Sequence, residues 1–162
     1  GDFARSSDAT IANYVVSHVP EYTYLLCFDD HLAPRLETSR PPNESVLRRS
    51  RWGLGGRGTV LLSDGKIFPD TPREPIDART AVGFDREKRL LFLAVFENAS
   101  PWRALDKLAK LGAVDGMLLD GGNSTSMAIG DKAQGARPGV LMGRWRPVAT
   151  HFGVRARELS TK

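Results

Sequence analysis

The chain has a single cysteine, Cys27, and few aromatic residues, which make up 8% of its 162 residues. One cysteine excludes an internal disulfide and a structural zinc site built from several cysteines. The longest apolar run, at residues 90–96, is far shorter than the roughly 20 residues that a membrane-spanning helix needs. No membrane span is therefore expected.

The aromatic residues are not interleaved with the basic ones, as a platform for stacking single-stranded nucleic acid requires. The net charge of +4 favours anionic partners in general. Charge alone keeps a basic nucleic-acid-binding domain open as an alternative, and the affinity of such a domain would fall steeply with salt. We therefore expect a partner other than nucleic acid.

What the chain does have is enough apolar material for one core. Hydrophobic residues make up 41% and charged residues 26%, which is typical of a globular protein and not of a disordered chain. The length suits one domain, residues 1–162, with one site.

Short apolar segments between turn residues predict strands. They occur at residues 14–16, 22–28, 79–84, 116–119, 127–129 and 147–154. The run at residues 90–96 does not alternate, and it predicts a strand buried on both faces. Asp64 and Gly65 lie between two apolar segments and predict a hairpin turn. The proline-rich stretch at residues 33–45 predicts an irregular loop.

One helix is clearly indicated, at residues 101–111. Ser100 can cap its free N–H groups, and Pro101 fits the first helical position. Apolar residues follow at helical spacing, and Gly112 suits the left-handed conformation that ends a helix. These elements predict an α+β fold with a mixed β-sheet core and few helices.

The given sequence does not begin with an initiator methionine. Its first three residues, Gly1, Asp2 and Phe3, resemble the middle of a motif. We therefore expect that strands preceding residue 1 would complete the sheet and contribute to the site.

A glycine-rich segment, GLGGRG at residues 53–58, matches the dinucleotide-binding pattern G-x-G-x-x-G. A dinucleotide loop needs a strand before it and a helix after it, whereas here a strand is expected after it. We interpret these glycines as positions where the backbone packs tightly or approaches a ligand.

A second glycine-containing segment, LLDGGNSTS at residues 118–126, follows a predicted buried strand. Its carboxylate, glycines and hydroxyl groups predict a concave polar rim that can hold a phosphate or a sugar. The alternative is an ordinary turn with local side-chain hydrogen bonds. Arg79 and Arg146 each stand at the start of a predicted strand, and a guanidinium group suits a phosphate.

The order of four motifs resembles the phosphodiester glycosidase family. The motifs are GLGGRGTVLLSDGK at residues 53–66, ARTAVG at residues 78–83, LDGGNST at residues 119–125 and RPVA at residues 146–149. The resemblance covers residues 53–155, and the first three residues also resemble part of a family motif, more weakly. It implies hydrolysis of a sugar 1-phosphodiester, such as an N-acetylglucosamine 1-phosphodiester or a phosphoglycan, in an extracytoplasmic setting and without a cofactor.

The resemblance also implies roles for individual residues. Such a reaction needs a carboxylate at the sugar carbon and cations on the departing phosphate. We assign the carboxylate role, as base or nucleophile, to Asp120 and the phosphate to Arg79. Asp2 and Glu97 are the candidates for a second carboxylate. The expected substrate-binding residues are Thr80, Gly121, Gly122, Asn123, Ser124, Thr125 and Arg146.

No metal ligands are assigned. Asp29, Asp30 and His31 are adjacent, and neighbouring residues of an extended chain point to opposite faces, so they ligate one ion poorly.

The chain departs from the family pattern at three places. Residues 97–99 are Glu-Asn-Ala where the family has Asp-Gly-Arg, Ala4 replaces a phenylalanine, and Asn123 replaces a glycine. Asparagine tolerates left-handed backbone geometry better than most residues do. The departure at residues 97–99 and the missing N-terminus keep a second function open, a non-catalytic glycan- or phosphate-binding module of the same fold.

Overall fold

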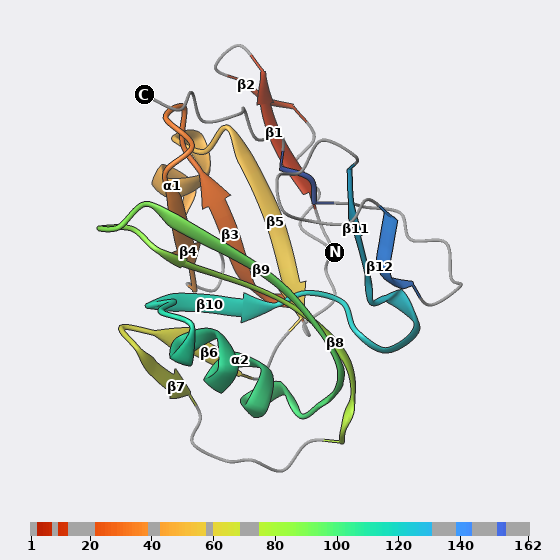
Figure 1. Cartoon of the computed structure of the whole chain (residues 1–162). Coiled ribbons are helices and arrows are strands. Elements are labelled where there is room, and N and C mark those ends of the chain that lie inside the picture. Colours follow the sequence, from red (N-terminus) through yellow and green to blue (C-terminus); the bar gives the residue numbers. More distant parts are fainter. Residues whose placement is uncertain are drawn as a thin grey trace, which may run out of the picture.

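The computed structural model describes residues 3–7, 10–12, 22–38, 43–57, 60–68, 75–130, 139–143 and 152–154. Two five-stranded sheets make up most of this part of the chain (Figure 1). The first sheet has the order β2-β1-β5-β3-β4 and the second has the order β7-β6-β10-β8-β9. The expected α+β class with few helices is confirmed, and the described strand pairs are all antiparallel rather than mixed.

The strands of the first sheet are β1 (Phe3–Ser7), β2 (Thr10–Ala12), β3 (Tyr22–Phe28), β4 (Pro34–Glu37) and β5 (Trp52–Arg57). Those of the second are β6 (Leu61–Ser63), β7 (Lys66–Phe68), β8 (Asp77–Asp85), β9 (Leu90–Ala99) and β10 (Asp115–Leu118). A separate pair consists of β11 (Ser126–Ile129) and β12 (Gly139–Gly143). The helices are α1 (Glu44–Arg48), α2 (Pro101–Lys110) and the short 3₁₀ helix η1 (Gly122–Ser124).

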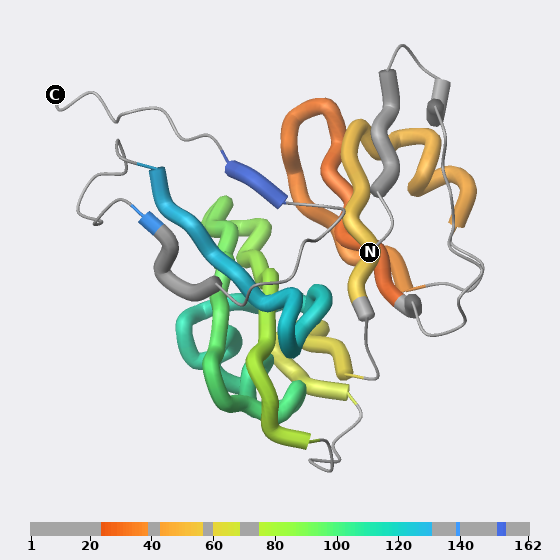
Figure 2. Tube along the Cα trace, turned by 90° about the vertical axis from the view of Figure 1, so that its right-hand side faces the viewer, coloured from red at the N-terminus to blue at the C-terminus, as the bar shows by residue number. Residues whose placement is uncertain are grey.

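The two sheets stack face to face, and each carries a helix on its outer side, as the separate groups of strands in Figure 2 show. Alternation along the strands builds these layers, because successive side chains point to opposite faces. On β3, Leu26 packs between the sheets, whereas Cys27 packs with Val46 of α1. On β10, Met117 packs between the sheets and Leu118 packs in the cluster under α2. Burial raises the pKa of the Cys27 thiol.

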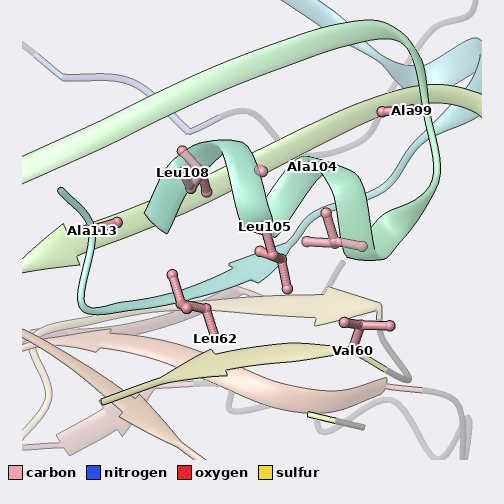
Figure 3. Close-up of a cluster of buried hydrophobic side chains, with 9 residues drawn as sticks. Val60, Leu62, Ala99, Ala104, Leu105, Leu108 and Ala113 are labelled. Atoms are coloured by element: carbon pink, nitrogen blue, oxygen red, sulfur yellow. The ribbon is translucent and has the colours of Figure 1, made fainter. Parts of the chain in front are cut away.

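Helix α2 begins and ends close to where the sequence predicts. The Ser100 hydroxyl accepts a hydrogen bond from the Arg103 N–H, and Gly112 has a φ of +107° just after the helix. Its apolar face, with Ala104, Leu105 and Leu108, lies on the second sheet (Figure 3). No helix in the described residues is long and apolar enough to span a membrane.

The predicted hairpin is also confirmed. Strands β6 and β7 pair across a turn in which Asp64 has a φ of 48° and Gly65 a φ of 73°. Positive φ at both central residues is the type I′ geometry that Asp-Gly favours.

Three sequence-based expectations are wrong. The run at residues 90–96 forms β9 at the edge of the second sheet, and most of its side chains are half-buried or exposed. Both of its faces are apolar because Leu91 meets the core between the sheets, while Phe92 meets the core under α2. A run without alternation therefore arises here at a sheet edge between two cores.

Residues 33–45 are not entirely a loop, since they contain β4 and the start of α1. Pro34 is tolerated because it opens an edge strand, where a missing N–H costs little. Most of the glycine-rich segment at residues 53–58 forms β5 in the middle of the first sheet. Residues 152–154 are not in a strand, and the expected strands at residues 14–16 and 147–151 lie outside the described residues.

Strand β5 touches the second sheet at Gly56, which agrees with the expected close backbone packing. A Cβ at this position would lie 2.5 Å from the carbonyl oxygen of Leu118 and 2.8 Å from the sulfur of Met117. The backbones can approach here because glycine has no side chain.

We expect Gly56→Ala to lower the free energy of unfolding by about 1–3 kcal/mol, since the new methyl group must push two sheets apart. Equilibrium denaturation with urea measures this loss. Gly130→Ala is the matched control, because nothing lies within 4 Å of a Cβ at position 130. Equal stability of the two variants would contradict the close packing at Gly56.

Candidate functional site

The candidate site begins where β10 ends and its chain turns away from β8. Leu118 pairs with Ala81, and the Leu119 N–H donates to the Thr80 carbonyl oxygen at 2.9 Å, which continues the pairing by one residue. Asp120 follows directly and is exposed. Its Oδ1 accepts the Gly121 N–H at 2.9 Å. The register of β8 and β10 therefore brings Asp120 into the loop beside Arg79.

The backbone after Asp120 forms a tight turn against the start of β8. A Cβ at Gly121 would lie 2.9 Å from the Ala78 carbonyl oxygen and 3.3 Å from Nη1 of Arg79. Gly122 has a φ of +58°, and a Cβ there would lie 3.0 Å from Oδ2 of Asp77. Both glycines are thus required, the first by close contact and the second also by its left-handed backbone.

The guanidinium of Arg79 is held in place by the backbone. Its Nε donates to the Ala99 carbonyl oxygen at 3.2 Å, and Nη2 donates to the Pro75 carbonyl oxygen at 2.6 Å. Among the described residues, no carboxylate forms an ion pair with it, and Nη1 has no protein acceptor. An oriented guanidinium with spare donors is suited to a phosphate oxygen.

The polar residues after the glycines differ in exposure. Asn123 is exposed, and Ser124 is half-buried with its N–H on the Gly121 carbonyl oxygen. Thr125 is fully buried, and its hydroxyl has no hydrogen-bond partner in the part of the chain that is described. The turn therefore contains local hydrogen bonds, as the alternative of an ordinary turn predicts. It also contains the buried Thr125 hydroxyl, which has no hydrogen-bond partner among the described residues.

The structure brings together only some of the predicted site residues. Asp120, Arg79 and the two glycines meet at one end of the second sheet. Thr80 lies on the opposite face of β8 from Arg79, because Val82 on its side packs between the sheets and Ala81 packs under α2. The Thr80 carbonyl oxygen contacts the loop by accepting the hydrogen bond from the Leu119 N–H.

Glu97 is not joined to the loop. It is exposed on β9, and its carboxylate makes no ion pair or hydrogen bond with any described residue. Asp2 and Arg146 lie outside the described residues. Their assigned roles stay predictions.

Sequence reasoning missed Asp77, whose half-buried carboxylate lies against Gly122. Its Oδ1 accepts the Ala78 N–H at 2.7 Å. Asp77 opens β8 opposite Ala99, so it stands at the same end of the sheet as Asp120. The signal was a carboxylate two residues before Arg79, at the start of the same strand.

The segment at residues 29–31 forms a local turn. Asp29 Oδ1 accepts the N–H groups of His31 and Ala33, both at 2.9 Å. The hydrogen bond from Ala33 is the main cause that lowers the pKa of Asp29. Across the described ranges, no three His, Cys, Asp or Glu side chains gather as a metal site.

Comparison with known families gives a match. The family model described as phosphodiester glycosidase matches residues 7–155. This range contains the second sheet, with Arg79 on β8, and the turn at residues 120–125, which we call the glycine turn. No curated protein matches the chain.

Proposed function

The chain belongs to the phosphodiester glycosidase family, and we propose that it hydrolyses the bond between the anomeric carbon of a sugar and the oxygen of a 1-phosphodiester. The substrate class is a sugar 1-phosphodiester of the N-acetylglucosamine type or a phosphoglycan that carries this linkage. By the same resemblance, we propose that the substrate is an extracytoplasmic glycan.

The observation that carries this proposal is the state of Arg79. Its guanidinium is oriented by the carbonyl groups of Ala99 and Pro75, lies beside the Gly121 backbone and has no carboxylate partner among the described residues. A fixed cation with unused donors stabilises negative charge as it develops on a leaving phosphate. Asp120 is an exposed carboxylate of the same turn and supports attack at the sugar carbon.

The chemistry makes modest demands on the protein. When the bond between the sugar carbon and the phosphate oxygen breaks, the electron pair leaves with a phosphate monoester, which needs no proton from the protein. Water supplies the oxygen that ends on the sugar. The residues of the turn therefore have two tasks, to assist the attack of water at the sugar carbon and to hold the phosphate. A carboxylate suits the first task, and a guanidinium suits the second.

The test is hydrolysis of an N-acetylglucosamine 1-phosphodiester in water enriched in oxygen-18. We expect free sugar and phosphate monoester in equal amounts, with the heavy oxygen in the sugar. Heavy oxygen in the phosphate would mean cleavage of the P–O bond and would overturn the glycosidase assignment. Binding of the diester without release of sugar, measured by calorimetry, would support the non-catalytic module instead.

A further inference from the structure

Strand β9 forms one edge of the second sheet, and this edge lacks the usual protection. Exposed edges offer unpaired N–H and C=O groups to other chains, so proteins blunt them with charges, prolines or short strands. The other edge strands of the two large sheets are blunted, since β2 and β7 have three residues each and β4 begins with Pro34. Strand β9 has ten residues and no charge before Glu97. In the described part of the chain, β9 pairs with β8 alone, because nearby β11 pairs with β12 instead.

The side chains on one face of β9 have an apolar middle and a charge at each end. Leu91, Leu93, Val95 and Glu97 alternate along the strand and so share the face turned away from α2, and Arg89 directly precedes the strand. Leu91 packs between the sheets, whereas Leu93 is 38% exposed. The Arg89 and Glu97 side chains form no ion pair with any described residue. This stripe therefore has an exposed centre and two unused charges of opposite sign.

The stripe is complementary to a second copy of itself. When two copies of β9 pair antiparallel about a two-fold axis through Leu93, the two Leu93 side chains lie opposite each other. Leu91 then lies opposite Val95 of the second copy, and Arg89 lies opposite Glu97. Apolar pairs and opposite charges across two strands both stabilise their pairing. The apolar run is thus matched with itself, and each charge meets its opposite.

Charge also selects this register over its neighbours. A two-fold axis normal to the sheet keeps the faces aligned only if the axis moves by whole residues. An axis through Phe92 would set Glu97 against Glu87 of the second copy, which places like charges together. An axis through Ala94 would set Glu97 against Leu91 and bury a carboxylate beside an apolar side chain. The register centred on Leu93 avoids both costs.

We propose that the chain forms a two-fold symmetric dimer through antiparallel pairing of β9 with β9 of a second copy. The two second sheets then form one continuous sheet, with five strands from each copy. Each contact away from the axis occurs twice, because the same surface patch serves both copies. The two Leu93 side chains cover each other at the centre, and an Arg89–Glu97 ion pair closes each end.

Sedimentation velocity of the purified chain across the micromolar range tests this dimer. We expect Leu93→Lys to raise the Kd for dimerisation by about 10²-fold, because it removes an apolar contact at the axis and sets two ammonium groups against each other. A thermal melt should show an intact fold, since Leu93 is exposed. Phe68→Lys is the matched control, because Phe68 is 52% exposed on β7, at the other edge of the same sheet. This control should dimerise as the wild-type chain does.

Exchange of the two charges tests the register. Arg89→Glu and Glu97→Arg should each weaken the dimer, because each substitution sets like charges against each other at both ends. The double variant Arg89→Glu/Glu97→Arg should restore dimerisation, since it only reverses the pair. Within one copy the two residues lie at opposite ends of β9, so a role in the fold of a single chain would not produce this rescue.

A disulfide tests where the axis lies. Leu93→Cys should give a covalent dimer on mild oxidation, because the two new thiols meet at the axis. Val95→Cys should not, since position 95 lies opposite position 91. The natural Cys27 is buried and should not interfere.

A wild-type chain that stays monomeric across the whole concentration range would overturn the proposal. A dimer that persists unchanged in Leu93→Lys would overturn it too, because the interface would then lie elsewhere. Failure of the double charge variant to regain dimerisation, or equal cross-linking of Val95→Cys and Leu93→Cys, would contradict the proposed pairing.

Discussion

Asp120→Asn should lower the release of sugar from an N-acetylglucosamine 1-phosphodiester by about 10³-fold or more. The reason is electrostatic, because an amide cannot support positive charge at the sugar carbon or attack it as a carboxylate can. The fold should be unaffected, since Asp120 is exposed and the asparagine oxygen can still accept the Gly121 N–H. Single-turnover kinetics together with a thermal melt measure both effects.

A matched control for this variant is Asp30→Asn. Asp30 is also exposed, and it lies in the turn after β3, in the first sheet. We expect this substitution to leave kcat unchanged. A near wild-type rate in Asp120→Asn would remove Asp120 from the reaction and would shift attention to the other carboxylates at the turn.

Arg79→Lys keeps the positive charge and should still lower kcat by about 10²–10³-fold. Lysine carries its donors on one nitrogen, so it cannot bind the Ala99 and Pro75 carbonyl oxygens and also meet a phosphate in a fixed direction. The affinity for the phosphate monoester product should weaken too, because this ligand depends on the same group. Steady-state kinetics and product inhibition check both expectations.

The Arg79 substitution also removes the donor to the carbonyl of buried Ala99, which costs about 1–3 kcal/mol of stability. Activity must therefore be compared well below the melting transition of the variant. Arg86→Lys is the control. Arg86 is exposed and directly follows β8, at the end of the strand that lies away from Arg79, and it also donates to a backbone carbonyl oxygen, that of Pro34. Unchanged kcat and product inhibition in Arg79→Lys would contradict a phosphate role for Arg79.

Local signals in the sequence predicted those elements whose cause is local. The cap at Ser100, the proline at position 101 and the glycine at position 112 define α2 without help from distant residues. The turn at Asp64 and Gly65 defines the hairpin of β6 and β7 in the same way. Such elements follow from backbone geometry within a few residues.

Elements that depend on their neighbours were harder to predict. Strand β9 has the pattern of a buried strand, yet it lies at a sheet edge, because its two apolar faces meet two different cores. No strand was predicted at the glycine-rich segment that forms β5, and its extended form is held by pairing with β1 and β3 on either side. Strand pairing between distant segments sets these conformations, and local propensity does not reveal it.

In the candidate site, too, some features follow from the sequence and others from the tertiary structure. The sequence by itself determined which groups the turn carries, a carboxylate, two glycines and hydroxyl side chains at residues 120–125, and the family to which the whole chain belongs. Only the tertiary structure decided that Arg79 lies across Gly121, that Asp77 reaches Gly122, and that Thr80 faces the other way. The physical reason is the antiparallel register of β8 and β10, which aligns residues about forty positions apart in the chain, while alternation along β8 assigns neighbouring side chains to opposite faces.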